Sequence, residues 1–441
     1  MDFKGQIMNI CVLGLWHLGC VTAASLATLG HQVVGLDYDV DLVRGLKNGS
    51  PPVFEPGLIE LVSQGMESGS LKFISSLEDL NMNIDFLWVT YDTPVDENDV
   101  ANEDFVFEKI ELTLPQITFD TIIIISSQLP VGSIKRLEKI IELNYSEKKL
   151  TVVCAPENLR LGNAINIFLN QERVVLGVRN QKHFEKLVAL FNPITENIKW
   201  MKPESAEMTK HSLNSFLALS IAYANEVARV CEVVGASYHE VEAGLKSDQR
   251  IGSKAYLSSG NSYAGGTLAR DVEFFRKITK QNSQEFPLLN AIRFSNQRHK
   301  YWSFYKIKEL WPDLSGLEIV VWGLTYKSGT STLRRSLAVE LVDLLILEGT
   351  VIRVHDDKAE DLPASWTKTV QRFQDPIVAL KKSKVLLIGT PSSNYKEILE
   401  KNIERLPQDI TIIDAGGYFA GLKLPKLVRY ISVGLCEERY S

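Results

Sequence analysis

The hydrophobic positions at the start of the chain fall into three segments of different length. Residues 8–14 (MNICVLG) and 31–37 (HQVVGLD) are short runs of strand-forming residues, and the second run ends in Asp37. Between them, residues 15–30 form a longer apolar stretch that begins after one glycine and ends at another. A strand, a glycine turn, a helix, a second strand and an acid, in this order, predict a βαβ unit of the dinucleotide-binding kind.

Four further runs of apolar, strand-forming residues follow in the first half of the chain, and helical segments separate most of them. This alternation predicts an α/β fold with a parallel sheet covered by helices on both faces. The runs are residues 84–90, 121–127, 150–156 and 173–177.

From Ser205 the pattern changes to apolar residues at helical spacing, and it continues to Gly235. Ser205 is a candidate N-cap and Gly235 a candidate stop. A helix over this stretch is roughly 45 Å long, which is too long for a crossover between two strands. The pattern therefore predicts a helical middle domain with a long central helix, and this helix is a candidate homodimer surface.

The opening pattern returns after a segment at 311–316 that contains Pro, Ser and Gly. Residues 317–324 (LEIVVWGL) predict a strand that leads into a glycine turn, and a second predicted strand ends in Asp356. A glycine precedes this acid by seven residues, and the same spacing separates Gly30 from Asp37. We therefore predict two doubly wound, Rossmann-like domains related by a distant internal repeat.

Composition narrows the class of protein. A chain of 441 residues has room for two or three domains, and 45% apolar with 23% charged residues is the balance of a folded soluble protein. The net charge of −6 disfavours nucleic-acid binding. Five scattered cysteines predict a reducing, cytoplasmic location and no metal site. Glycines and His17 interrupt the apolar stretch at 9–30, so we do not expect a membrane span. We also expect no signal peptide, because no basic segment and cleavage site frame this stretch.

An ordered set of short motifs runs along nearly the whole chain. The first is the glycine turn at 14–19, followed by the EPGL segment at 55–58. The later motifs are SSQLPVG (126–132), APENLRLGNAI (155–165), EMTKHSLNSFLA (207–218), DQRIGSKAYL (248–257), AGGTLARD (264–271) and GLTYKSGTSTLRRS (323–336). In this order, the set resembles the nucleotide-sugar (UDP-glucose/GDP-mannose) dehydrogenase family.

The resemblance implies NAD-dependent oxidation of the C6 primary alcohol of a nucleotide sugar, with a UDP-sugar favoured, toward the uronate, for polysaccharide or glycoconjugate synthesis. In the family, a cysteine in a loop written GGSCFPKD captures the intermediate aldehyde. Thr267 stands at that position here. A threonine hydroxyl needs a neighbouring base to act as a nucleophile, whereas a thiol forms thiolate near neutral pH. An ester through Thr267 is therefore disfavoured. Hydration of the aldehyde, its release, or no reaction remain open.

The resemblance also implies catalytic roles for four more side chains. Lys210 and Asn214 match a pair of the family and lie one helical turn apart, so that the lysine can stabilise a developing alkoxide. Asp271 follows Thr267 as the family's base follows its cysteine. Glu157 matches a carboxylate that handles protons and water. A solvated helix lysine and a loop-capping acid are the alternatives for Lys210 and Glu157.

Two further positions depart from the family's pattern. Leu161 stands where the family has a second acid, and Gln128 stands where it has a threonine that positions water. Together with the missing cysteine, these changes alter the part of the site that handles water in the family.

The implied cofactor site is built around the glycine turn. Trp16 replaces the middle glycine, which normally lets the backbone approach the pyrophosphate. Its indole either points away and leaves the backbone amides free for the anion, or it obstructs NAD. Asp37 is placed to hold ribose hydroxyls and to disfavour NADP, with a strand-end turn acid as the alternative. The candidate cofactor-binding residues are Gly14, Trp16, His17, Leu18, Gly19, Asp37, Thr93 and Arg334.

The substrate site implied by the resemblance draws on several motifs. Arg250 matches an arginine that reaches into the partner subunit's site, with a structural salt bridge as the alternative. Tyr326 matches an aromatic residue of the substrate pocket, although core packing explains it equally well. The candidate substrate-binding residues are Asn158, Leu159, Arg250, Tyr256, Gly265, Tyr326 and Lys327.

We therefore predict an NAD-binding Rossmann domain at 1–202, a helical middle domain with the catalytic loop at 203–310, and a nucleotide-sugar-binding domain of UDP type at 311–441. The expected partners are NAD, a nucleotide sugar and a second copy of the chain, without nucleic acid or membrane. The alternatives are a catalytically silent protein that binds the nucleotide sugar or NAD, and a two-electron enzyme that releases the aldehyde.

Overall fold

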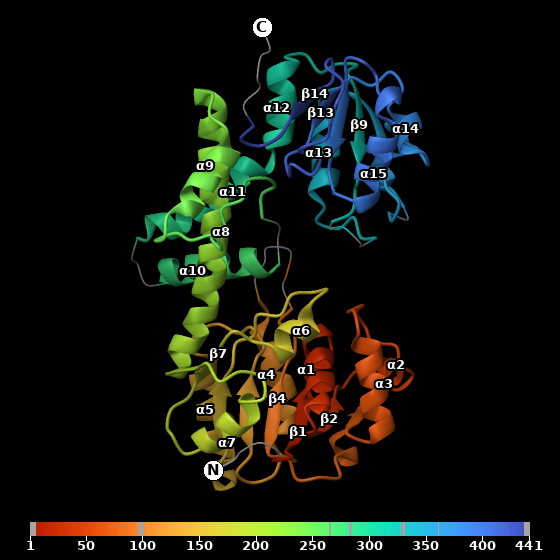
Figure 1. Cartoon of the computed structure of the whole chain (residues 1–441). Coiled ribbons are helices and arrows are strands. Elements are labelled where there is room, and N and C mark those ends of the chain that lie inside the picture. Colours follow the sequence, from red (N-terminus) through yellow and green to blue (C-terminus); the bar gives the residue numbers. More distant parts are fainter. Residues whose placement is uncertain are drawn as a thin grey trace. The chain divides into compact units, whose positions relative to one another are not determined.

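The computed structural model describes residues 6–94, 96, 101–263, 266–281, 285–326, 328, 331–359 and 361–435 (Figure 1). By its internal contacts the chain divides into two units, Met1–Leu213 and Asn214–Ser441.

The first unit is built on an eight-stranded sheet in the order β3-β2-β1-β4-β5-β6-β7-β8. Its neighbouring strands pair in parallel except β6 and β7, which meet through one antiparallel pair, Cys154 with Gly177. Each apolar run expected to form a strand contains one. The strands are β1 (Asn9–Leu13), β2 (Gln32–Leu36), β3 (Leu71–Ile74), β4 (Phe86–Val89), β5 (Ile122–Ile125), β6 (Thr151–Cys154), β7 (Val174–Gly177) and β8 (Ile198–Met201).

Successive residues of these strands face two separate apolar cores, because side chains alternate across a strand. Ile10 and Val12 pack in one core, which also contains buried residues of α1, α3, α6 and α7. Cys11 and Leu13 pack in the other, with α4 and α5. The helices are α1 (His17–Thr28), α2 (Val40–Lys47), α3 (Leu58–Ser68), α4 (Glu103–Thr113), α5 (Ser133–Asn144), α6 (Ala164–Leu169) and α7 (Phe184–Phe191).

The predicted long helix is α8, Pro203–Val234, drawn as one continuous helix in Figure 1. It begins two residues before Ser205, so the expected N-cap is wrong. Proline suits the first helical position because its missing N–H would have no acceptor there. The helix ends directly before Gly235, whose φ of +78° fits the predicted stop. Among the described residues, no helix has the length and apolar character needed to cross a membrane.

The second unit adds four helices and then a six-stranded parallel sheet in the order β11-β10-β9-β12-β13-β14. Helix α13 shares one core with Ile319 and Val321, whereas α15 shares the other with Val320 and Trp322, so helices cover both faces. The elements are α9 (Tyr238–Ser247), α10 (Thr267–Gln281), α11 (Pro287–Lys300), α12 (Trp302–Leu310), β9 (Glu318–Trp322), α13 (Leu337–Leu347), β10 (Val351–His355), β11 (Val370–Arg372), α14 (Pro376–Ala379), β12 (Val385–Ile388), α15 (Ser393–Lys401), β13 (Thr411–Ile413) and β14 (Arg429–Ile431).

The two sheets repeat the same turn after their first strand, as the sequence predicts. Gly14 has φ +96° and donates its N–H to the oxygen of Leu36, while Gly323 has φ +84° and donates to His355, in both cases at 2.9 Å. A Cβ on Gly323 would lie 2.0 Å from the oxygen of Thr390, so only glycine fits. The α/β fold with two Rossmann-like domains and a helical middle region is therefore confirmed.

Candidate active site

The first glycine turn leads into the N-terminus of α1, where several backbone N–H groups are available to a ligand. A Cβ on Gly19 would lie 1.7 Å from the oxygen of Gly14, which requires glycine where α1 begins under the turn. Among the residues that the structure describes, the backbone N–H groups of residues 16–19 have no hydrogen-bond acceptor. Such amides at a helix N-terminus attract a pyrophosphate, so the turn fits a dinucleotide.

Trp16 lies within this turn, and Asp37 is hydrogen-bonded to it. Trp16 directly precedes α1 and is 46% exposed, so its indole is not packed into the protein core. Asp37 is buried at the end of β2, and its Oδ2 accepts the N–H of Leu15 at 2.7 Å. Its Oδ1 accepts the N–H of Asp39 at 3.1 Å and the hydroxyl of Tyr91 at 3.3 Å. The protein thus fixes the orientation of the acid expected to hold the ribose. The motif reasoning missed Tyr91.

Two loops that follow neighbouring strands meet near Thr93. Its hydroxyl donates to the backbone oxygen of Gln128 at 2.7 Å. Thr93 therefore fixes the segment after β5 that carries the altered SSQLPVG motif, whereas cofactor contact by Thr93 stays a prediction.

Glu55 of the EPGL segment is a buried carboxylate whose role the sequence reasoning missed. Its Oε2 lies 2.9 Å from Nε2 of His17 and accepts the N–H of Gly162 at 2.8 Å. Its Oε1 accepts the N–H of Ala164 at 2.8 Å. Burial alone would raise the pKa of Glu55, but these hydrogen bonds hold the pKa below its ordinary value. The only signal in the sequence is the EPGL motif, which does not indicate the partners.

Lys210 lies against the loop that begins at Glu157. Its ammonium donates to the backbone oxygen of Glu157 and to Oδ1 of Asn158. The Glu157 carboxylate accepts the N–H of Leu159. Both acceptors of Lys210 are uncharged oxygens, so its positive charge is held in place without being neutralised by them. Sequence reasoning placed these four residues in one site, and the structure brings them together.

A small cavity of about 20 Å³ opens beside this lysine. Its lining includes Lys210, Glu157, Gln128, Ser127 and Glu207. The buried hydroxyl of Ser127 has no hydrogen-bond partner among the described residues. Burial raises the pKa of Glu207, whose carboxylate accepts two backbone N–H groups at the start of α5. A polar cavity of this size accommodates one water molecule. Sequence reasoning did not find Ser127 or Glu207.

In the second unit, Asn214 of α8 donates from Nδ2 to Oδ2 of Asp271 in α10. Asp271 is fully buried, and Asn214 is 6% exposed. Thr267 is the first residue of α10 and is exposed, four positions before Asp271. The structure thus joins two of the predicted catalytic residues directly, whereas Gly265 of the same motif lies outside the described residues.

The segment before this motif is clamped by buried polar side chains that sequence reasoning missed. Asn225 accepts the N–H of Gly260 at 2.8 Å, and His299 Nε2 donates to the oxygen of Gly260 at 2.6 Å. Asn296 makes two hydrogen bonds of 3.0 Å with the backbone of Tyr263. Burial lowers the pKa of His299 to about 4. No motif marks these residues because they lie on α8 and α11, far from the loop in sequence.

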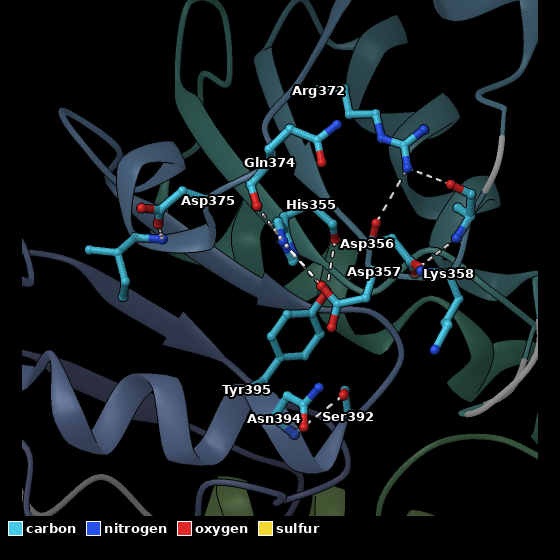
Figure 2. Close-up of polar contacts among 12 residues, drawn as sticks. His355, Asp356, Asp357, Lys358, Arg372, Gln374, Asp375, Ser392, Asn394 and Tyr395 are labelled. Carbon is cyan, nitrogen blue, oxygen red and sulfur yellow. Dashed lines mark hydrogen bonds and ion pairs between the residues drawn. The ribbon is translucent and has the colours of Figure 1, made fainter.

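In the second Rossmann-like domain, backbone N–H groups occupy both carboxylate oxygens of Asp356, the acid that follows β10. Asp356 accepts the N–H groups of Leu324 and Thr325 through Oδ2, and those of Lys358 and Ala359 through Oδ1. Against the effect of burial, they lower the pKa of Asp356. Figure 2 shows Asp356 beside His355, whose Nδ1 lies 2.9 Å from the Tyr395 hydroxyl. Asp356 therefore fixes the turn of this domain.

The remaining substrate candidates are dispersed. Arg250 pairs with Asp248 at 2.7 Å on the surface, which is the salt bridge considered as its alternative. Tyr256 is 58% exposed, and Tyr326 donates its N–H to Thr332 at 2.8 Å. Arg334 is exposed, and Lys327 lies outside the described residues.

Models of one known family match most of the chain. Three models match: the NAD binding domain of the UDP-glucose/GDP-mannose dehydrogenase family over residues 8–195, its central domain over 204–298 and its UDP binding domain over 320–420. The chain belongs to the UDP-glucose/GDP-mannose dehydrogenase family. The first of these models is an NAD binding domain, so NAD is the cofactor of this dehydrogenase.

Individual relatives are similar along nearly their whole length. A UDP-glucose 6-dehydrogenase of Rickettsia bellii is 30% identical over 97% of this chain and 99% of its own. One of Pseudomonas aeruginosa is 27% identical over 95% and 96%. The solved structure of a UDP-glucose dehydrogenase from Pyrobaculum islandicum superposes with a TM-score of 0.84 at 26% identity, covering 99% of this chain and 100% of that one.

Proposed function

We propose that this dehydrogenase oxidises the C6 primary alcohol of a UDP-linked hexose to the carboxylate, and that it does so without a covalent intermediate on the enzyme. The observation that carries the proposal is the ammonium of Lys210, which two uncharged oxygens hold in place. Such a charge stabilises an alkoxide that develops as hydride leaves carbon.

UDP is favoured over other nucleotides by two comparisons. The family model that matches residues 320–420 is described as a UDP binding domain, and the Rickettsia and Pseudomonas relatives are UDP-glucose 6-dehydrogenases. We accordingly assign NAD binding to residues 1–202, the helical middle domain to 203–310 and UDP binding to 311–441.

The first oxidation needs a group that removes the proton of the alcohol and a charge that stabilises the alkoxide. When bound, NAD accepts the hydride in each oxidation. Asp271 is the base, oriented by Asn214, and Lys210 supplies the positive charge. The alcohol loses a proton and a hydride and becomes an aldehyde.

The second oxidation needs water. The polar cavity beside Lys210 and Glu157 has room for one water, and the Ser127 hydroxyl is available to bind it. Addition of that water to the aldehyde gives a gem-diol, and loss of a second hydride and a proton from the diol gives the carboxylic acid. This route needs no bond between Thr267 and the substrate.

A second copy of the chain is the protein partner that we propose. Phe216, Tyr223 and Val230 lie seven residues apart on α8 and are 64%, 50% and 58% exposed. Residues at this spacing form one stripe along a helix, which is the pattern of a helix–helix interface.

The test is the stoichiometry of NADH formation with UDP-glucose, UDP-N-acetylmannosamine and GDP-mannose. Two NADH per UDP-sugar support the proposal. One NADH per sugar, with aldehyde trapped by hydroxylamine, supports the two-electron alternative. Tight binding without NADH formation supports the silent alternative.

A further inference from the structure

Glu55 connects two segments of the first unit that the proposed reaction uses separately. His17 is the first residue of α1, the helix whose N-terminus serves the cofactor. Gly162 lies near the end of the loop that starts at Glu157, and Ala164 is the first residue of α6, which follows this loop. The carboxylate of Glu55 binds all three residues, at 2.8 to 2.9 Å, although they are 38 to 109 positions away in sequence.

The buried position of Glu55 makes it difficult to replace. Glu55 is 3% exposed, and its three donors use both carboxylate oxygens. A buried carboxylate with three donors has few other arrangements that satisfy all partners. Movement of α1 at His17 therefore moves the acceptor for Gly162 as well.

The linked loop also contacts the candidate catalytic lysine. Five residues before Gly162, the backbone oxygen of Glu157 accepts a hydrogen bond from Lys210, and Asn158 provides its second acceptor. The path from the cofactor helix to Lys210 thus runs through His17, Glu55 and one short loop, with a hydrogen bond at each contact between segments.

We propose that Glu55 and His17 are positioning residues that couple the binding of the dinucleotide to the binding of the nucleotide sugar. This inference rests on the proposed function, because it takes α1 as the cofactor helix and the 157–162 loop as part of the sugar site. When a dinucleotide orders the start of α1, the His17–Glu55 contact orders the loop that the sugar meets. By linkage, each ligand raises the affinity for the other by the same factor.

The experiment measures this factor directly. The Kd of NADH is determined by fluorescence titration of the full chain, with and without saturating UDP-glucose, a pair that does not turn over. We expect UDP-glucose to lower the Kd of NADH about fivefold or more in the wild type, the lower end of known couplings. Because the factor is a ratio, a change in NADH affinity alone cancels from it.

Three variants and one control test the link. His17→Leu loses the donor, and we expect its coupling factor to fall to about one. His17→Gln keeps an N–H donor and should restore coupling, while Glu55→Gln should reduce it. His31→Gln is the matched control, because His31 is buried beyond the other end of α1 and neither ring nitrogen has a hydrogen-bond partner among the described residues. It should keep the wild-type factor.

The outcomes separate this inference from the proposed function. Two results would overturn this inference: a coupling factor in His17→Leu equal to that of the wild type, or no coupling in the wild type. If the chain still oxidises a UDP-sugar, either result leaves the proposed function standing. Failure of the wild type to bind NADH or any UDP-sugar overturns both.

Discussion

Asn214 donates a hydrogen bond from its side-chain amide to the carboxylate of Asp271, which has no exposed surface. A buried carboxylate is costly unless donors satisfy it, and its conformation is fixed when they do. The pair thus explains how α8 orients a residue of α10 that we propose as the base. Removing either member should affect the reaction more than the fold, because the replacement can keep the shape.

Asp271→Asn should lower kcat by roughly 100- to 10,000-fold, because the amide keeps the shape of the side chain but cannot accept a proton in the reaction. The measurement is NADH formation from UDP-glucose, with circular dichroism to confirm folding. Asp409→Asn is the control, since Asp409 pairs with Lys384 at the surface. An unchanged kcat in Asp271→Asn would exclude this residue as the base.

Thr267→Ala should keep two NADH per sugar and a kcat close to that of the wild type. The hydration route forms no bond to the Thr267 hydroxyl, and the exposed residue begins α10 without filling a core position. Mass spectrometry of the quenched reaction should find no sugar attached to the wild-type protein. A covalent adduct that disappears in Thr267→Ala would sink the non-covalent route.

His299 should make the protein less stable as the pH falls from 7 to 5. Its pKa is lowered by burial from 6.5 to about 4, so the unfolded chain binds the proton more readily, and stability is lost below pH 6.5 until about pH 4. The loss from this group alone is roughly 2 kcal/mol between pH 7 and pH 5. Urea unfolding at the two pH values measures it.

The control for this pH effect is His299→Gln, whose amide can still donate to the oxygen of Gly260 but does not titrate. Between pH 7 and pH 5, the free energy of unfolding of this variant should fall by about 2 kcal/mol less than that of the wild type. Equal losses in both proteins would show that other groups account for the acid sensitivity.

Tyr223→Glu should dissociate the proposed homodimer, because it puts a charge in the middle of the exposed stripe on α8. Sedimentation velocity at several concentrations measures the change in mass. Leu347→Glu serves as the control, since Leu347 is 83% exposed on α13 and lies off the stripe. A wild type that sediments as a monomer at all concentrations would contradict the interface.

The sequence by itself determined the two βαβ turns, the strands and the long helix. Gly14 and Gly323 form the predicted glycine turns, both with positive φ, and Asp37 and Asp356 follow the predicted strands. These features were predictable because the signals that determine them are local. The spacing of apolar side chains, a glycine at a turn and an acid at a strand end each depend on a few neighbouring residues. The sequence also related the motifs to a dehydrogenase family, and it showed that Thr267 stands at the position of that family's cysteine.

Only the tertiary structure decided which side chains satisfy which distant groups. Glu55 meets Gly162 across 107 positions, and His299 meets Gly260 from another helix. It also decided that Trp16 is exposed and that α8 begins at Pro203. A buried polar group must find its partner in space, and the folding of the whole sheet brings that partner within reach, so no local pattern in the sequence indicates which residue it is.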